Sequence, residues 1–352
     1  MKRSIAAIAV VVAIATAACG GGSKSSKSAT GSSGNSGSSA ATTVRLGYFP
    51  NITHAVALVG IDKGILAKDL GTDKLDTSKS FNAGPAATEA LLSGAIDATF
   101  IGPSPSITAF TQSHGAVKIV SGAASGGAAL VVKPSITSVD DLKGKTIATP
   151  QLGNTQDVAL RAFLESKGFK ADTQGGGDVH IKPQDNSQTI DTFKQGTIDG
   201  AWVPEPYLSR LVIEGGAKVL VDEKTLWPQG QWVTTNLLVR TAFLKAHPET
   251  VKRLLTGLYD TVQYIKTNPA DAQTSANNQL GALTGKKLSD KVIAAAFGNL
   301  NFTVDPLAST LRKQAKDAQT VGLLNSPKTD GIYDLSLLNE VLKSKSQATV
   351  AS

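Results

Sequence analysis

The sequence is poor in the residues that build disulfides and metal centres. It has one cysteine, Cys19, so no intrachain disulfide can form. Its four histidines show no metal-ligand spacing, and no arrangement of nucleophile, base and acid stands out. We therefore expect no metal, no cofactor and no enzymatic activity.

Concentrated positive charge is also missing. The formal net charge is +7, but lysines and arginines are scattered along the chain, and aromatic residues make up only 5% of it. A nucleic-acid-binding surface needs basic residues that gather on one face, often with aromatic residues among them. We expect no nucleic-acid partner.

The longest apolar run, from Ile5 to Ala18, is shorter than the roughly 20 residues that span a bilayer as a helix. Preceded by Lys2 and Arg3, it predicts an export signal over residues 1–18. The sequence Thr16-Ala17-Ala18-Cys19 resembles a bacterial lipobox, although Thr16 stands where the pattern usually has Leu, Val or Ile. It predicts a lipid on Cys19 and a position on the extracytoplasmic face of the cell membrane. Cleavage after Ala17, in an A-x-A pattern, is the alternative.

Most residues between Gly20 and Thr43 are glycine or serine, and they show no apolar periodicity. Such a composition is typical of a flexible linker. We therefore interpret residues 19–43 as a lipidated cysteine followed by a tether, and expect the folded body to begin at Val44.

One pattern occurs twice in the body, as GAIDATFIGPSP from Gly94 and as GTIDGAWVPEPY from Gly196. In each copy a glycine closes a helical segment, a short apolar run follows, and a turn with proline opens the next helix. The repeat predicts two similar α/β lobes. With 352 residues and 41% apolar residues, the chain can bury two cores.

Two extended segments, Leu130–Lys133 and Thr234–Val239, are interpreted as crossings between the lobes. This places residues 44–129 and 240–352 in the first lobe and residues 130–239 in the second. Ligands of open α/β sheets bind beyond the carboxyl ends of the strands. We therefore expect one cleft between the lobes.

Three helices are expected to begin at this cleft, after Gly84, Gly102 and Gly153. Their first amides are unpaired and carry partial positive charge, which favours anions. The predicted wall loops almost lack lysine and arginine, whereas doubly charged phosphates usually recruit arginine. A monoanion such as a sulfonate fits better.

Several stretches resemble the sulfonate, taurine and nitrate class of substrate-binding proteins of ABC importers: GYFPNITHA, LLSGAIDATFIGPSPS, DLKGKTIATPQLGNTQDVALRAFL, FKQGTIDGAWVPEPY and WVTTNLLVRTAFLKAHPE. The resemblance covers residues from about 43 to about 266. It implies a two-lobe periplasmic-binding-protein fold (type II) with two hinge crossings. It also implies a monomer that delivers a small anion, an aliphatic sulfonate or taurine first of all, to a permease with its ATPase.

By the same resemblance the ligand-binding residues are Tyr48, Asn51, His54, Ser104, Ser106, Asn154, Thr155, Gln156, Glu205, Thr234, Thr235 and Asn236. Glu205 precedes a proline, as an acidic residue does in taurine-type members, and would suit an amine on the ligand. Nitrate, bicarbonate or a thiamine-pyrimidine precursor are alternative ligands. An enzyme like the pyrimidine synthase of the same superfamily is a further alternative, but that enzyme is cytosolic and has a cysteine-rich motif that this chain lacks.

Overall fold

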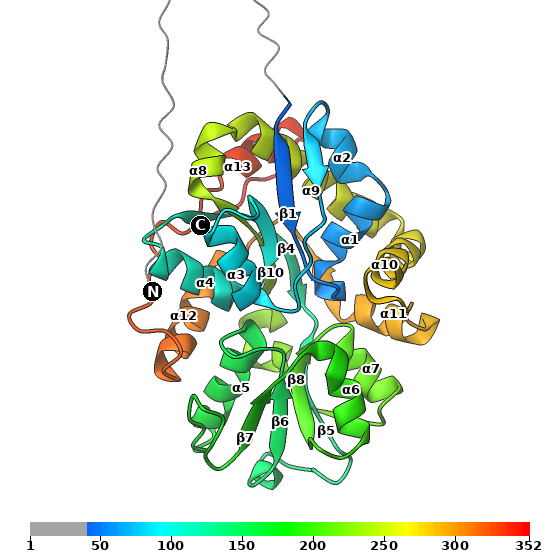
Figure 1. The fold of residues 1–352 in the computed structure, drawn as a ribbon, viewed down its shortest axis with the longest axis vertical. Coiled ribbons are helices and arrows are strands. Elements are labelled where there is room, and N and C mark those ends of the chain that lie inside the picture. The colour runs from blue at the N-terminus through cyan, green and yellow to red at the C-terminus, as the bar shows by residue number, and fades with distance from the viewer. Residues whose placement is uncertain (1–40) are drawn as a thin grey trace, which may run out of the picture. The chain divides into compact units, whose positions relative to one another are not determined.

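A computed structural model describes residues 41–352, which form two α/β lobes (Figure 1). The predicted signal segment, Cys19 and most of the predicted linker lie outside these residues. The first lobe contains a six-stranded sheet of order β11-β4-β10-β3-β1-β2, and the second a five-stranded sheet of order β7-β6-β8-β5-β9. Two lobes with a sheet in each agree with the predicted fold class.

The first sheet combines parallel and antiparallel pairs: β1 is parallel to β2 and β3, while β10 is antiparallel to β3 and β4. Its strands are β1 (Thr43–Gly47), β2 (Lys74–Asp76), β3 (Ala98–Ile101), β4 (Val117–Gly126), β10 (Val233–Arg240) and β11 (Leu300–Phe302). Its helices are α1 (Ala55–Asp62), α2 (Ile65–Leu70), α3 (Gly84–Leu92), α4 (Pro103–Gln112), α8 (Thr241–Ala246), α9 (Pro248–Thr267), α10 (Pro269–Thr284), α11 (Asp290–Gly298), α12 (Leu311–Thr320) and α13 (Ser336–Ser344).

The second sheet follows the same plan, with β6 parallel to β7 and β8, and β5 antiparallel to β8 and β9. Its strands are β5 (Ala128–Val132), β6 (Thr146–Thr149), β7 (His180–Pro183), β8 (Gly200–Pro204) and β9 (Lys218–Asp222). Its helices are α5 (Thr155–Ser166), α6 (Asn186–Lys194) and α7 (Tyr207–Ile213). In Figure 1, α5 lies on one side of this sheet and α6 and α7 on the other.

The repeated pattern forms the same structure in both lobes. Gly94 and Gly196 both have φ 78°, in the left-handed region that favours glycine, and β3 and β8 follow them. The aspartate of each copy ties its strand to the parallel neighbouring strand: Arg45 N–H of β1 donates to Asp97 Oδ2 at 3.1 Å, and Thr146 N–H of β6 donates to Asp199 Oδ2 at 3.0 Å. The prediction of two similar lobes is confirmed.

The crossings between the lobes differ in position from the predicted segments. The chain leaves β4 and enters β5 at Gly126–Gly127, and it returns from β9 to β10 through residues 223–232. The predicted segment Leu130–Lys133 overlaps β5, and the predicted segment Thr234–Val239 lies within β10. Each segment therefore begins shortly after the crossing in the chain. The first crossing is a turn of two glycines with positive φ, and the second contains the short 3-10 helices Glu223–Leu226 and Pro228–Gly230.

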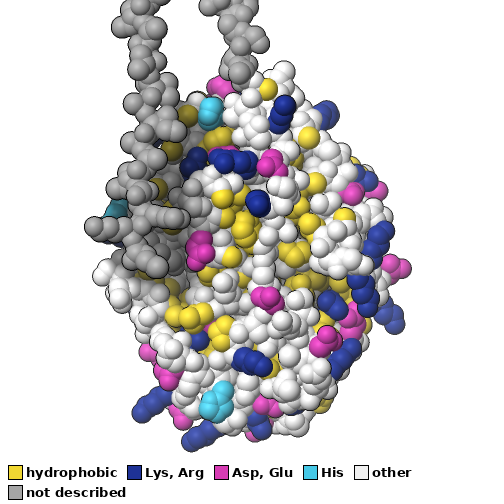
Figure 2. All heavy atoms as spheres, in the orientation of Figure 1, with side chains coloured by type: hydrophobic (Ala, Val, Ile, Leu, Met, Phe, Trp, Pro, Cys, Tyr) yellow, Lys and Arg dark blue, Asp and Glu magenta, His cyan; other side chains and the backbone are white. Residues whose placement is uncertain are grey.

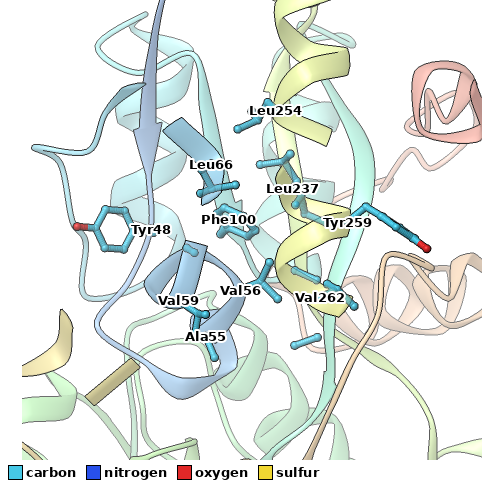
Figure 3. Close-up of a cluster of buried hydrophobic side chains, with 14 of the residues drawn as sticks. Tyr48, Ala55, Val56, Val59, Leu66, Phe100, Leu237, Leu254, Tyr259 and Val262 are labelled. Carbon is cyan, nitrogen blue, oxygen red and sulfur yellow. The ribbon is translucent and has the colours of Figure 1, made fainter. Parts of the chain in front are cut away.

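Apolar clusters cover both faces of the first sheet. A large apolar cluster joins α1, α9 and α10 to one face of the first sheet (Figure 3). A second cluster on the other face contains Leu311 and Ala315 of α12 together with Val158 of α5, so it reaches from the first lobe into the second. No helix in residues 41–352 has the length and apolar character to cross a bilayer. On the visible face in Figure 2, Lys and Arg side chains are interspersed with Asp and Glu.

Candidate functional site

A small cavity lies between the lobes, beyond the carboxyl ends of β1, β3, β6, β7 and β8, where the sequence predicted a cleft. Its volume is about 20 Å³, about the space that one water molecule needs. The lining residues are Phe49, Asn51, Thr53, His54, Asn82, Ala83, Gly84, Gly102, Pro105, Pro150, Asn154, Thr155, Gln156, Asn186, Pro204 and Thr234.

Four helices begin at this cavity, two from each lobe. Gly84 is the first residue of α3, Gly102 the N-cap of α4, Asn154 the N-cap of α5 and Asn186 the first residue of α6. The first amides of a helix have no partner within it and carry about half a positive charge. Within the described chain no Lys, Arg, Asp or Glu lines the cavity. The cavity wall therefore offers neutral hydrogen-bond donors and the partial positive charge of the helix N-termini.

Some of the buried polar atoms that have no partner within residues 41–352 line the cavity. Among the described residues, atoms without a partner include Thr155 Oγ1 and both amide atoms of Asn186, which line it, and also Ser104 Oγ and both amide atoms of Asn236. A buried polar atom without a partner costs about 1 to 3 kcal/mol. A ligand that accepts and donates hydrogen bonds here would remove this cost.

His54 forms part of the cavity wall as a neutral ring. Burial lowers the pKa of His54 to about 3. Phe49 N–H donates to His54 Nδ1 at 3.3 Å, so the hydrogen-bond pattern assigns the ring proton to Nε2. The Phe49 and His54 rings stack with centroids 4.2 Å apart. His54 can therefore donate one hydrogen bond to a ligand without carrying a charge.

The N-terminus of α5 is held in place from within its own lobe. Asn154 Oδ1 accepts from Asp157 N–H at 2.8 Å, and Asn154 Nδ2 donates to Gln156 Oε1 at 3.1 Å. Asp157 Oδ2 accepts from Gly153 N–H at 2.9 Å. These bonds fix the turn that leads into the helix and leave the Thr155 hydroxyl without a partner among residues 41–352.

Hydrogen bonds across the cavity mouth join the two lobes. Asn82 of the first lobe donates from Nδ2 to Pro150 O at 3.1 Å and accepts at Oδ1 from Asn186 N–H at 3.2 Å. Near the hinge, Ile52 N–H donates to Glu205 O at 3.0 Å. Together with the small cavity volume, these contacts describe two lobes that are closed on each other.

The structure brings half of the predicted ligand-binding residues to the cavity: Asn51, His54, Asn154, Thr155, Gln156 and Thr234 line it. The other six do not. Tyr48 OH donates to Thr77 O at 3.3 Å, and its ring lies at the edge of the core cluster with the hydroxyl directed away from it (Figure 3). Ser106 Oγ donates to Gly102 O at 2.8 Å, inside its own helix turn.

Thr235 and Asn236 lie in β10, in the middle of the first sheet. Thr235 Oγ1 donates to Thr53 O at 2.9 Å and so supports a lining residue from behind. Asn236 is fully buried, and its amide has no partner among the described residues. Ser104, in the first turn of α4, has a hydroxyl without a partner in the described part of the chain, but it does not line the cavity.

The Glu205 side chain is fully buried, but it does not line the cavity. Its carboxylate accepts hydrogen bonds from protein groups that do not line the cavity either. Its Oε1 accepts from Ser209 Oγ at 2.8 Å and from Asn299 Nδ2 at 2.7 Å, and its Oε2 accepts from Ser209 N–H at 3.1 Å. Burial raises the pKa of Glu205, while the bonds from Asn299 and Ser209 lower it. Because Asn299 follows α11 of the first lobe, the carboxyl group joins the lobes beside the hinge.

Sequence reasoning missed three polar lining residues, Thr53, Asn82 and Asn186. Asn186 opens a helix after β7, the same strand-turn-helix arrangement that identified Asn154, and this signal could have found it. The sequence predicts a strand that ends at Asn82, but the structure has only an isolated bridge between Tyr48 and Ser80 at this point. Residues 41–352 contain no cluster of three His, Cys, Asp or Glu side chains that could hold a metal ion.

Comparison with known families gives a match over most of the described chain. The model of the NMT1-like family matches residues 37–279. The taurine-binding periplasmic protein of Escherichia coli K12 is 33% identical over 195 residues, which cover 54% of this chain and 58% of that protein. The match thus spans somewhat more than half the length of that relative.

Solved structures share the fold. The alkanesulfonate-binding protein of Xanthomonas axonopodis pv. citri superposes with a TM-score of 0.67 at 20% identity, covering 82% of this chain and 96% of its own. The periplasmic nitrate-binding protein of Synechocystis PCC 6803 superposes with a TM-score of 0.73 at 17% identity, covering 86% of this chain and 89% of its own. At such identities the likeness establishes the two-lobe binding-protein fold and nothing finer.

Proposed function

Because the chain belongs to the NMT1-like family, we propose that it is an extracytoplasmic solute-binding lipoprotein that captures an aliphatic sulfonate or taurine. It releases this ligand to an ABC permease and its ATPase, acts as a monomer and performs no chemistry on the ligand. The observation that carries the proposal is the cavity between the lobes, where four helix N-termini meet and no charged side chain of residues 41–352 lines the wall.

The charge of the cavity favours a monoanion. Each helix N-terminus contributes about 0.3 to 1 kcal/mol to anion binding, so four supply a few kcal/mol, whereas micromolar affinity needs about 8. Neutral donors must supply the rest, and Thr155, Asn186 and His54 are available. A phosphate dianion would face this wall without arginine or lysine, which makes a sulfonate the better ligand.

Nitrate is the second candidate, and the narrowness of the cavity favours it. A volume of about 20 Å³ has room for about one water molecule, so any anion requires the lobes to open, and a compact anion requires less opening than an alkyl chain. A sulfonate with a tail therefore requires the lobes to open further than nitrate does. We propose that opening occurs about Gly126–Gly127 and residues 223–232, where the chain crosses between the lobes.

A thermal-shift and calorimetry panel with taurine, ethanesulfonate, nitrate, bicarbonate and a thiamine-pyrimidine precursor tests the ligand class. A ligand at 100 times its dissociation constant stabilises the protein by about 2.7 kcal/mol. We expect ethanesulfonate or taurine to bind most tightly. Binding of the neutral pyrimidine alone, or of none of the anions, would contradict the proposal.

The Thr155→Val variant tests whether the cavity is the site. It removes a buried hydroxyl that has no partner within residues 41–352, and it keeps the shape of the side chain. A lost hydrogen bond to an anion should weaken binding by about 10- to 150-fold. Thr274→Val, at an exposed position of α10, is the matched control and should bind like the wild type. Unchanged affinity in Thr155→Val would place the site elsewhere.

The lipid anchor on Cys19 has its own test, because Cys19 lies outside the described residues. Mass spectrometry of the mature N-terminus should show a diacylglycerol-modified cysteine, and Cys19→Ala should move the protein from the membrane to the soluble fraction. Ser23→Ala, in the predicted linker, is the control and should stay with the membrane. An unmodified N-terminus at Ala18 would support ordinary signal cleavage instead.

A further inference from the structure

We propose that Asp157 and Arg161 of α5 are a positioning pair for the anion site, in which Asp157 holds the turn before the helix and Arg161 masks the charge of Asp157 from the ligand. This inference rests on the proposed function, because it assigns a role at the same site. Neither residue lines the cavity. They act through Gly153, Asn154 and Thr155.

Asp157 is at the centre of the hydrogen bonds that shape this wall. Its Oδ2 accepts from Gly153 N–H at 2.9 Å and from Arg161 Nε at 3.0 Å, and its Oδ1 accepts from Thr149 Oγ1 at 2.9 Å. Its own N–H donates to Asn154 Oδ1 at 2.8 Å. One side chain thus ties together the end of β6, the turn after it and the first turn of α5, which form part of the second-lobe wall.

Arg161 compensates the negative charge of Asp157. Asp157 stands in the first turn of a helix whose N-terminus faces the cavity, and its carboxylate is fully buried. A buried negative charge beside an anion site opposes binding, because a Coulomb interaction is strong where water is excluded. Arg161, one turn later and 1% exposed, supplies the compensating charge and does not itself line the cavity. Its Nη1 also donates to Asp172 O.

Stability alone is a weak reason for this pair. Of the ion pairs among residues 41–352, Asp157–Arg161 is the one in which both side chains are at most 1% exposed. Burying two charges costs desolvation energy that their attraction often fails to recover, so an apolar pair would serve the core equally well. An apolar residue at position 157, however, could not hold Gly153 N–H and Thr149 Oγ1.

Affinity for ethanesulfonate, taurine and nitrate, measured by calorimetry, separates charge masking from packing. Arg161→Gln leaves the charge of Asp157 uncompensated and should weaken binding roughly tenfold or more. Arg161→Lys keeps the charge and should stay within about threefold of the wild type. The double variant Asp157→Asn with Arg161→Gln removes both charges and should recover most of the loss. Glu165→Gln, an exposed position of the same helix, is the control for charge removal.

Equal weakening in Arg161→Gln and in the double variant would indicate lost packing and overturn the masking role, as would wild-type affinity in Arg161→Gln. Hydrogen exchange measured by mass spectrometry tests the positioning role without ligand. Asp157→Ala should accelerate exchange in the segment 151–155 at least tenfold, because Gly153 N–H loses its acceptor. Unchanged exchange would overturn it. If the wild type binds none of these anions, the proposed function fails, and the exchange result still decides whether Asp157 positions the turn.

Discussion

Asn82 of the first lobe and Asn186 of the second are joined at the cavity, where Asn82 Oδ1 accepts a hydrogen bond from the Asn186 main-chain N–H at 3.2 Å. The same Asn82 side chain donates to Pro150 O at 3.1 Å. One amide in the first lobe therefore binds two main-chain groups of the second. Because these bonds exist only while the lobes are together, they favour the closed state.

The Asn82→Ala variant should weaken ligand binding. Two hydrogen bonds contribute about 1 to 3 kcal/mol to closure, so the apparent affinity should fall about 5- to 150-fold, through a smaller population of the closed state. Calorimetry with the ligand found by the anion panel measures the loss, and small-angle scattering should show a larger particle in Asn82→Ala. Asn325→Ala, at an exposed position, is the control. Equal affinity and equal size in Asn82→Ala and the wild type would contradict a closing role.

The Glu205→Gln variant should destabilise the protein without selecting between ligands. Ser209 and Asn299 donate to the two oxygens of the Glu205 carboxylate. A glutamine offers these donors only one oxygen. We expect a loss of about 1 to 3 kcal/mol in the free energy of unfolding, measured in urea. The ratio of the affinities for taurine and ethanesulfonate should stay unchanged, since Glu205 does not line the cavity.

The control for Glu205→Gln is Glu340→Gln, because Glu340 is 53% exposed and far from the hinge in sequence. It should change neither stability nor affinity measurably. A loss of taurine binding alone in Glu205→Gln would show that the carboxylate reaches the amine, as the sequence resemblance implied. In that case the lobes must bind taurine in an arrangement that differs from the one described here.

His54 should make the folded state sensitive to acid. Its pKa is lowered to about 3, whereas an exposed histidine has a pKa near 6.5, so the unfolded chain binds one more proton between these values. The contribution of His54 to stability is complete above pH 6.5 and is lost as the pH falls toward 3. At pH 5 the loss is about 2 kcal/mol relative to pH 7.5.

Urea unfolding of the wild type and of His54→Gln at pH 7.5 and pH 5 measures this contribution. The variant should lose about 2 kcal/mol less than the wild type between the two pH values. His180→Gln, at an exposed position, should lose as much as the wild type. Identical pH dependence in the wild type and His54→Gln would mean that the His54 ring is protonated in the folded protein at pH 5.

The sequence predicted the lobes and the location of the cavity, because both depend on local patterns. Gly94 and Gly196 each mark the end of a helix in the repeated pattern. The residues after β6 form a strand-turn-helix arrangement, which brings Asn154 and Thr155 to the cavity. Such features need only neighbouring residues. Side-chain direction at Glu205 depends instead on Asn299, which is 94 residues away in the sequence. No local pattern reports such a contact, and the same holds for Asn82.

The hinge crossing at Gly126 gives the last prediction. Gly126 has φ 86°, and a Cβ atom there would lie 2.8 Å from the main-chain oxygen of Asn299. Gly144 has φ 72° with no atom within 4 Å of such a Cβ, so it is a matched control. Gly144→Ala should cost about 1 to 2 kcal/mol of unfolding free energy from backbone strain alone. Gly126→Ala should cost about 1 to 3 kcal/mol more, because the chain around Asn299 must also move.

Urea unfolding of both glycine variants measures these costs, and calorimetry with the ligand found by the anion panel measures their effect on closure. Because Asn299 also donates to Glu205, a shift of Asn299 should weaken the contact between the lobes. We therefore expect Gly126→Ala to lose affinity as well as stability, while Gly144→Ala loses only stability. Equal stability and equal affinity in the two variants would mean that the crossing tolerates a side chain, and that Asn299 is free to move without disturbing the lobes.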